Sequence, residues 1–119
     1  MAAPNLVAPT NIKGRTASAS LTTSAADVLV NASSSNKLLK VNIIRAANIG
    51  TNSSTTVTVV FRRSSTDFYL IKDAIVSVGS SLVVNDKNEY LYLEEGDSIR
   101  ALASGASAID LLLHYEEIV

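Results

Sequence analysis

Apolar and polar residues alternate along three stretches of the chain, residues 37–49, 55–63 and 107–118, with the two-residue period of a β-strand. One face of each strand should enter the core. The side chains expected on that face are Leu39, Val41 and Ile43, then Val57, Val59 and Phe61, then Ile109, Leu111, Leu113 and Tyr115. The intervening side chains should face water, and these are Lys40, Asn42, Thr56, Thr58, Val60, Asp110, Leu112 and His114.

Clusters of Ser, Asn, Asp and Gly separate the apolar runs and are typical of turns. They occupy residues 31–36, 48–54, 64–66, 78–81, 85–88, 94–97 and 104–107. The spacing of roughly 8 to 12 residues is that of an all-β protein, and helical periodicity is nowhere sustained. We therefore expect about eight strands in a two-sheet antiparallel β-sandwich of the jelly-roll type.

The first 14 residues differ from the rest because they contain both prolines, Pro4 and Pro9, and no periodic apolar face. This composition predicts an extended N-terminal arm, residues 1–14, followed by a sandwich domain at 15–119. An arm of this kind needs a surface to lie on. Leu6, Val7 and Ile12 are the apolar side chains expected to anchor it on a partner.

Composition narrows the classes of function. The 119 residues suit one domain, and the formal net charge of -1 offers no field for nucleic acid or an anionic membrane. No cysteine is present, no apolar run has membrane-spanning length, and residues 1–15 lack the pattern of a secretory signal. With 5% aromatic residues, the core must be built mainly from aliphatic side chains.

The turn at residues 94–97 raises the question of metal binding because Glu94, Glu95 and Asp97 surround Gly96. Carboxylate oxygens in one flexible loop can hold Ca²⁺, but the regular ligand spacing of a known calcium loop is missing. Gly96 alone explains a tight reversal between two strands. The sequence favours a solvated turn.

Catalytic residue types are sparse. His114 is the only histidine, and no nucleophile motif accompanies it. The many serines and threonines occur in strand and turn contexts, and no glycine-rich phosphate loop is present. We therefore expect neither enzymatic activity nor a cofactor.

A surface patch is a further candidate. Tyr69, Tyr90 and Tyr92, with Arg62 and Arg63, could form an exposed aromatic surface for a sugar or a protein partner. Half-buried sheet tyrosines are an equally good reading of the same residues. The sequence leaves the two open.

Five strings of the sequence together resemble small virion structural proteins of tailed phages, especially those that infect marine bacteria and cyanobacteria. They are "MAAPNLV", "NASSSNKLLKVNIIRAANI", "SLVV", "YLYLEEGDSIRALAS" and "HYEEIV". The resemblance implies a β-sandwich present in many copies, either on the capsid shell or in the tail. It implies no catalytic residues.

Pattern and resemblance together lead us to expect a capsid decoration or cement protein in the virion, assembled in the host cytoplasm. It would bind the major capsid protein through its sandwich and arm, as a homo-oligomer with a trimer favoured, and would bind neither nucleic acid nor membrane. One alternative is a tail, baseplate or fibre-associated adaptor. Another is a carbohydrate-binding module.

Overall fold

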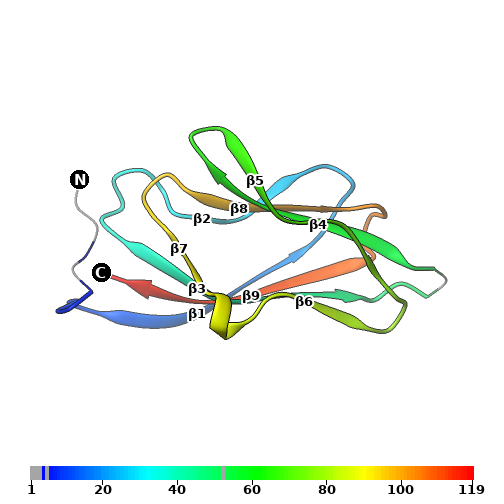
Figure 1. Cartoon of the computed structure of the whole chain (residues 1–119), viewed down its shortest axis with the longest axis horizontal. Helices are drawn as coiled ribbons and strands as arrows, with labels where there is room; N and C mark the ends of the chain where they lie inside the picture. The colour runs from blue at the N-terminus through cyan, green and yellow to red at the C-terminus, as the bar shows by residue number, and fades with distance from the viewer. Residues whose placement is uncertain (1–3, 5, 52) are drawn as a thin grey trace.

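A computed structural model describes residues 4, 6–51 and 53–119, which form nine strands and one short 3-10 helix (Figure 1). The strands are β1 (Ile12–Ser20), β2 (Ala26–Val30), β3 (Leu38–Asn48), β4 (Thr55–Arg63), β5 (Thr66–Val76), β6 (Ser81–Asn85), β7 (Leu91–Leu93), β8 (Ser98–Ala103) and β9 (Ile109–Ile118). The 3-10 helix, η1, spans Lys87–Glu89. No helix in these residues is long and apolar enough to cross a membrane.

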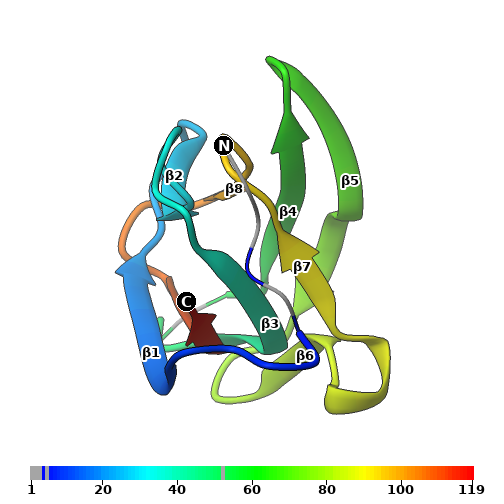
Figure 2. The ribbon, with the colours of Figure 1, turned by 90° about the vertical axis from the view of Figure 1, so that its left-hand side faces the viewer.

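The strands form two antiparallel sheets that pack face to face, which confirms the expected β-sandwich (Figure 2). One sheet has the order β1-β9-β3-β6, with β7 also paired to β3. The other has the order β2-β8-β4-β5. Strands distant in the sequence are therefore neighbours in space, as β1 and β9 illustrate by pairing Ile12 with Ile118.

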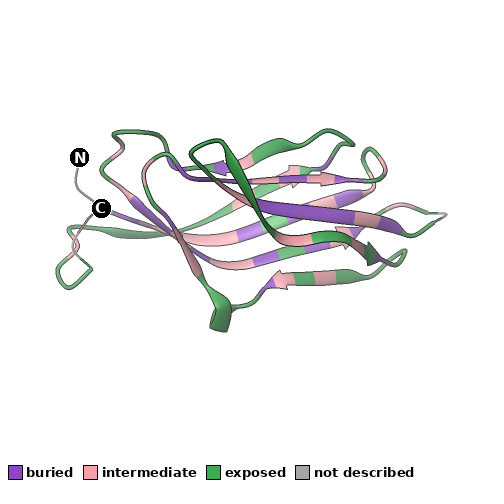
Figure 3. Ribbon diagram, turned by 45° about the horizontal axis from the view of Figure 1, so that its top comes forward, coloured by how far each residue is buried: buried purple, intermediate pink, exposed green. Residues whose placement is uncertain are grey.

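The core lies between the sheets and is almost entirely aliphatic. Buried residues concentrate in the middle of the strands, while loops and hairpin tips are exposed (Figure 3). Each fully buried Leu, Ile or Val contributes about 1.5–3 kcal/mol relative to an exposed side chain. The largest side chains with essentially no exposure are Ile44, Leu93, Ile99, Ile109, Leu111 and Leu113.

The expected inward face of β3 is wrong beyond Val41. A register shift against β9 falls between Val41 and Ile43, so the alternation changes phase at this bulge. Ile44 is fully buried in the core, whereas Ile43 is only partly buried and pairs with His114. A two-residue period cannot continue through a position where one strand has an extra residue.

The outward face of β4 is also buried, whereas the sequence predicts that it is exposed to solvent. Thr58 and Val60 are only 5% and 6% exposed. Val60 lies between Arg100 of β8 and Tyr69 of β5 in one cross-strand row, so longer side chains flank it on both sides. The central position of β4 in its sheet thus buries both of its faces.

Strand β5 is the edge strand beside β4 and is irregular. Its pairing with β4 shifts register between Val57 and Val59 and again between Val59 and Val60. Asp73 has a φ of 50° at the first irregularity, and its backbone N–H donates to the Thr58 hydroxyl at 3.0 Å. β5 is consequently bent rather than straight.

The N-terminal boundary differs from the expected arm. The edge strand β1 begins at Ile12, so Ile12, Lys13 and Gly14 pair with β9 and are part of the sheet. Just before them, the backbone N–H groups of Thr10 and Asn11 donate to the Val119 carbonyl at 2.7 and 3.2 Å. Of the remaining arm, residues 1–3 and 5 lie outside the described residues.

Candidate functional site

The acidic turn between β7 and β8 is built around a buried carboxylate, so the expectation of a fully solvated turn is wrong for Asp97. Its side chain is only 3% exposed. Its Oδ2 accepts the backbone N–H of Glu94 at 2.8 Å, and its own N–H donates to the Glu94 carbonyl at 3.0 Å. Gly96 has a φ of 90°, a conformation that favours glycine.

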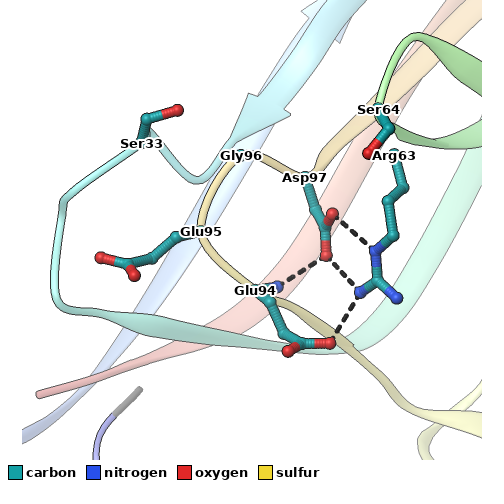
Figure 4. A pocket seen from close by; sticks show the side chains of 7 residues that line it. All are labelled: Ser33, Arg63, Ser64, Glu94, Glu95, Gly96 and Asp97. Carbon is teal, nitrogen blue, oxygen red and sulfur yellow. Dashed lines mark hydrogen bonds and ion pairs between the residues drawn. The ribbon is translucent and has the colours of Figure 1, made fainter. Parts of the chain in front are cut away.

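Arg63, the last residue of β4, binds this carboxylate with two parallel hydrogen bonds (Figure 4). Nε donates to Oδ1 of Asp97 at 2.9 Å, and Nη2 donates to Oδ2 at 2.6 Å. Nη2 also donates to Oε2 of Glu94 at 2.8 Å. The hydrogen bond to Asp97 raises the pKa of Arg63 above its ordinary value, so the guanidinium stays charged wherever the protein is folded.

The loop at residues 31–37 completes this junction. Asn31 is buried, and its Nδ2 donates to the carbonyls of Lys37 at 2.9 Å and Leu93 at 2.8 Å. Glu95 points away from Arg63 and accepts the backbone N–H of Asn36 at 2.6 Å (Figure 4). We call Asn31, Arg63, Glu94, Glu95 and Asp97 together the corner.

The corner borders a surface hollow of about 510 Å³, whose lining residues are Ser33, Arg63, Ser64, Glu94, Glu95, Gly96 and Asp97. Each of its three carboxylates already accepts a hydrogen bond from Arg63 or from the backbone. The described part of the chain contains no group of three or more His, Cys, Asp or Glu side chains that could hold a metal ion. The hydrogen bonds of the corner therefore connect the β7–β8 turn, the loop at residues 31–37 and the end of β4.

A second hollow, of about 490 Å³, lies beyond Ser64 and Gly96, which line both. We call it the arginine hollow, and its lining residues are Asp27, Val30, Arg62, Ser64, Ser65, Gly96, Ser98 and Arg100. Its guanidinium contacts are longer than those of the corner. Arg62 Nη1 donates to Asp67 at 3.3 Å, and Arg100 Nε lies 3.1 Å from Oδ1 of Asp27.

The predicted tyrosine patch is divided between the two sheets. Tyr90 precedes β7 and Tyr92 lies on it, with ring centroids 5.7 Å apart in an edge-to-face contact, and Lys40 Nζ lies 4.3 Å from the centre of the Tyr90 ring. Tyr69 lies on β5 of the other sheet, beside Lys72. The structure thus joins two of the three tyrosines and separates the third.

The two arginines of the predicted patch also separate. Arg63 turns to the corner, while Arg62 lies in the arginine hollow. Sequence reasoning missed Asp27, Ser98 and Arg100 as members of a common surface, because β2 and β8 are far apart in the sequence and become neighbours only in the folded sheet.

The proposed arm anchors are on the surface. Leu6 is 49% exposed, Val7 is 92% exposed, and Ile12 is half exposed within β1. His114 is partly buried on β9, where it pairs with Thr16 and Ile43.

No protein-family model and no curated protein matches the chain. Among solved structures, the chain is similar to a protein of the Bacillus endospore appendages, which form a family of disulfide-linked pili. The two share 14% sequence identity and a TM-score of 0.54, over 92% of this chain and 87% of the other. The fold therefore resembles that of a structural appendage protein, although this chain has no cysteine for a disulfide link.

Proposed function

We propose that the protein is a non-enzymatic structural subunit of a larger assembly, and within that class a capsid decoration protein that binds a shell of major capsid protein. The likeness to an appendage subunit supports the broader class. A further argument against a catalytic role is that Arg63 and the acidic residues of the corner are hydrogen-bonded to each other and hold segments of the fold together. The virion assignment rests on the sequence resemblance.

The observation that carries the proposal is the exposure of apolar side chains in the segment before β1. Leu6 precedes the point where Thr10 is hydrogen-bonded to Val119, and its side chain is half exposed. Covering the exposed half of this side chain on a partner contributes about 1 kcal/mol, roughly half the value for burying a fully exposed leucine. A modest contribution per subunit suffices when a lattice presents many copies and each attachment makes the next one intramolecular.

Deletion of residues 1–9 tests this role while leaving Thr10, Asn11 and β1 in place. We expect the truncated protein to remain folded, by circular dichroism and urea unfolding, and to be lost from purified virions, by quantitative mass spectrometry. Leu6→Asp should act in the same direction. Ile75→Asp is a matched control because Ile75 is an exposed apolar residue on β5, far from this segment in the sequence. Undiminished incorporation of the truncated protein would exclude the segment from attachment.

A filament subunit is the second candidate, favoured by the likeness to a pilus protein. It predicts that the purified protein polymerises alone, which electron microscopy of a concentrated sample would show. A tail or baseplate adaptor would instead be imaged at one end of the particle. A carbohydrate-binding module based on three tyrosines has less support, since Tyr69 lies in a different sheet from Tyr92.

A further inference from the structure

The arginine hollow has hydrogen-bond donors that the fold does not use. A guanidinium has five N–H donors, yet within residues 4, 6–51 and 53–119 Arg62 makes one hydrogen bond and Arg100 makes one, from Nη2 to the Ala25 carbonyl at 3.2 Å. Arg100 Nε is buried and lacks a hydrogen bond, because Asp27 lies close to it but outside hydrogen-bonding geometry. The donors open to an added acceptor are therefore those on the partly exposed parts of the two guanidinium groups, beyond Arg62 Nη1 and Arg100 Nη2, which the fold already uses.

The walls of the hollow indicate what kind of acceptor fits. Ser64, Ser65 and Ser98 contribute hydroxyl groups, and the half-exposed Val30 contributes an apolar surface. The volume is that of a small-ligand site. Guanidinium groups bind carboxylates through paired, charge-assisted hydrogen bonds.

We propose that the arginine hollow binds a carboxylate-bearing sugar, a uronic acid unit of an acidic polysaccharide. The sugar carboxylate would accept from Arg62 and Arg100, the ring hydroxyls would bond the serines, and a C–H face of the ring would contact Val30. This activity is separate from attachment to a shell through the segment before β1. It also differs in place and chemistry from a platform of stacked tyrosines.

A peptide is a poorer fit to the same surface. Peptides that join a sheet edge are held mainly by a continuous row of backbone groups. The adjacent edge strand, β2, is only five residues long, and its pairing with β8 shifts register between Asp27 and Leu29. A bulged, short edge of this kind disfavours an added strand.

The hairpin turn between β4 and β5 forms part of the rim. Ser64 and Ser65 have φ values of 52° and 64°, the positive values that a two-residue hairpin turn requires at both positions. The turn presents both serines to the hollow.

The test is a titration of ¹⁵N-labelled full-length protein with methyl glucuronide, followed by two-dimensional NMR. We expect saturable shifts of the amide signals of Ser64, Ser65 and Ser98. The neutral analogue, methyl glucoside, should give much smaller shifts at equal concentration. Added salt should weaken the binding of the glucuronide, because a partly exposed ion pair is screened.

Three variants sharpen the test. Arg62→Gln should weaken binding about tenfold, since it removes charge-assisted hydrogen bonds without touching the core. Asp27→Asn should strengthen binding, because it removes the carboxylate that competes for Arg100. Arg15→Gln is the matched control, because Arg15 is an exposed arginine of β1 that forms an ion pair with Glu117 of β9 at 3.5 Å, and the affinity should not change.

Each possible result of the titrations either supports or contradicts the proposal. Absence of saturable shifts, equal shifts with both sugars, or unchanged binding in a folded Arg62→Gln variant would overturn the proposal. Stronger binding of a triglutamate peptide than of the glucuronide would overturn the assignment to a sugar in favour of an acidic protein segment. None of these results bears on incorporation of the Δ1–9 protein into virions, so the two proposals fail independently.

Discussion

Two arginine sites lie on either side of Ser64 and Gly96, and they use the same residue types to opposite effect. At the corner, Arg63 holds Asp97 at 2.6–2.9 Å, and that carboxylate is almost fully buried. In the arginine hollow, Arg100 lies 3.1 Å from Asp27, whose side chain is 54% exposed. Burial of the carboxylate therefore distinguishes an ion pair inside the fold from one at the surface.

Strand phase explains the difference. Arg63 continues the inward series of Val57, Val59 and Phe61, and Asp97 directly precedes β8 in the inward phase of Ile99. Arg62 and Arg100 fall on the opposite face of the same two strands. A displacement of one residue along a strand therefore decides whether a guanidinium binds a buried carboxylate or an exposed one.

Asp97→Ala should produce the largest effect on this comparison. It removes a buried carboxylate that accepts three hydrogen bonds, from Arg63 and from the Glu94 backbone. We expect the free energy of unfolding to fall by about 3 kcal/mol, at the lower end for a buried pair because Arg63 is half exposed and can be rehydrated. Urea unfolding measures this loss.

Asp67→Ala is the matched control because Asp67 pairs with Arg62 at an exposed position. Its effect on the free energy of unfolding should stay below about 0.5 kcal/mol. Equal losses for the two aspartate variants would contradict the distinction between the corner and the hollow.

Asn31→Ala should destabilise the protein by about 2 kcal/mol, since it leaves the buried Leu93 carbonyl and the Lys37 carbonyl without their donor. Thermal unfolding, followed by circular dichroism, reports the change. Asn42→Ala removes a hydrogen bond to Glu116 at a less buried position and should be nearly neutral. A neutral Asn31 variant would show that the loop at 31–37 does not support the corner.

Gly96→Ala should have the smallest effect of the three, a loss of about 1 kcal/mol, because its φ of 90° strains any residue with a Cβ. Space is not the cause, since the nearest atom to an added Cβ would be the Ser33 hydroxyl at 3.8 Å. Gly14→Ala on β1, where the backbone is not strained and nothing lies within 4 Å, should be neutral or slightly stabilising. Comparison of the two urea midpoints isolates the conformational cost.

Much of the fold is predictable from the sequence, because the alternation of apolar and polar residues matches the alternation of buried and exposed side chains where strands are regular. The inward faces of β4 and β9 follow this rule. It fails at Ile43 because no residue type in this part of the sequence marks the position of the bulge in β3. It also fails at Val60, whose burial depends on Arg100 and Tyr69 arriving from two other strands.

The corner could have been found by extending the alternation to the ends of the strands. A charged residue in an inward phase must find a partner of opposite charge, and Arg63 and Asp97 both occupy such positions. The arginine hollow could not have been found in this way. Its members come from β2, β4, β8, the β4–β5 turn and the β7–β8 turn, so they meet only once the strand order β2-β8-β4-β5 is known.

The bent shape of β5 affects what happens when many copies are crowded together. An uninterrupted strand of its eleven residues, with Phe68, Tyr69 and Ile75 exposed, would be a template for open-ended cross-β stacking. The two register shifts of β5 against β4 interrupt that template, one beside Asp73 and one between Tyr69 and Ile71. We therefore expect β5 to be a poorer seed for cross-β stacking than a regular strand of the same sequence would be.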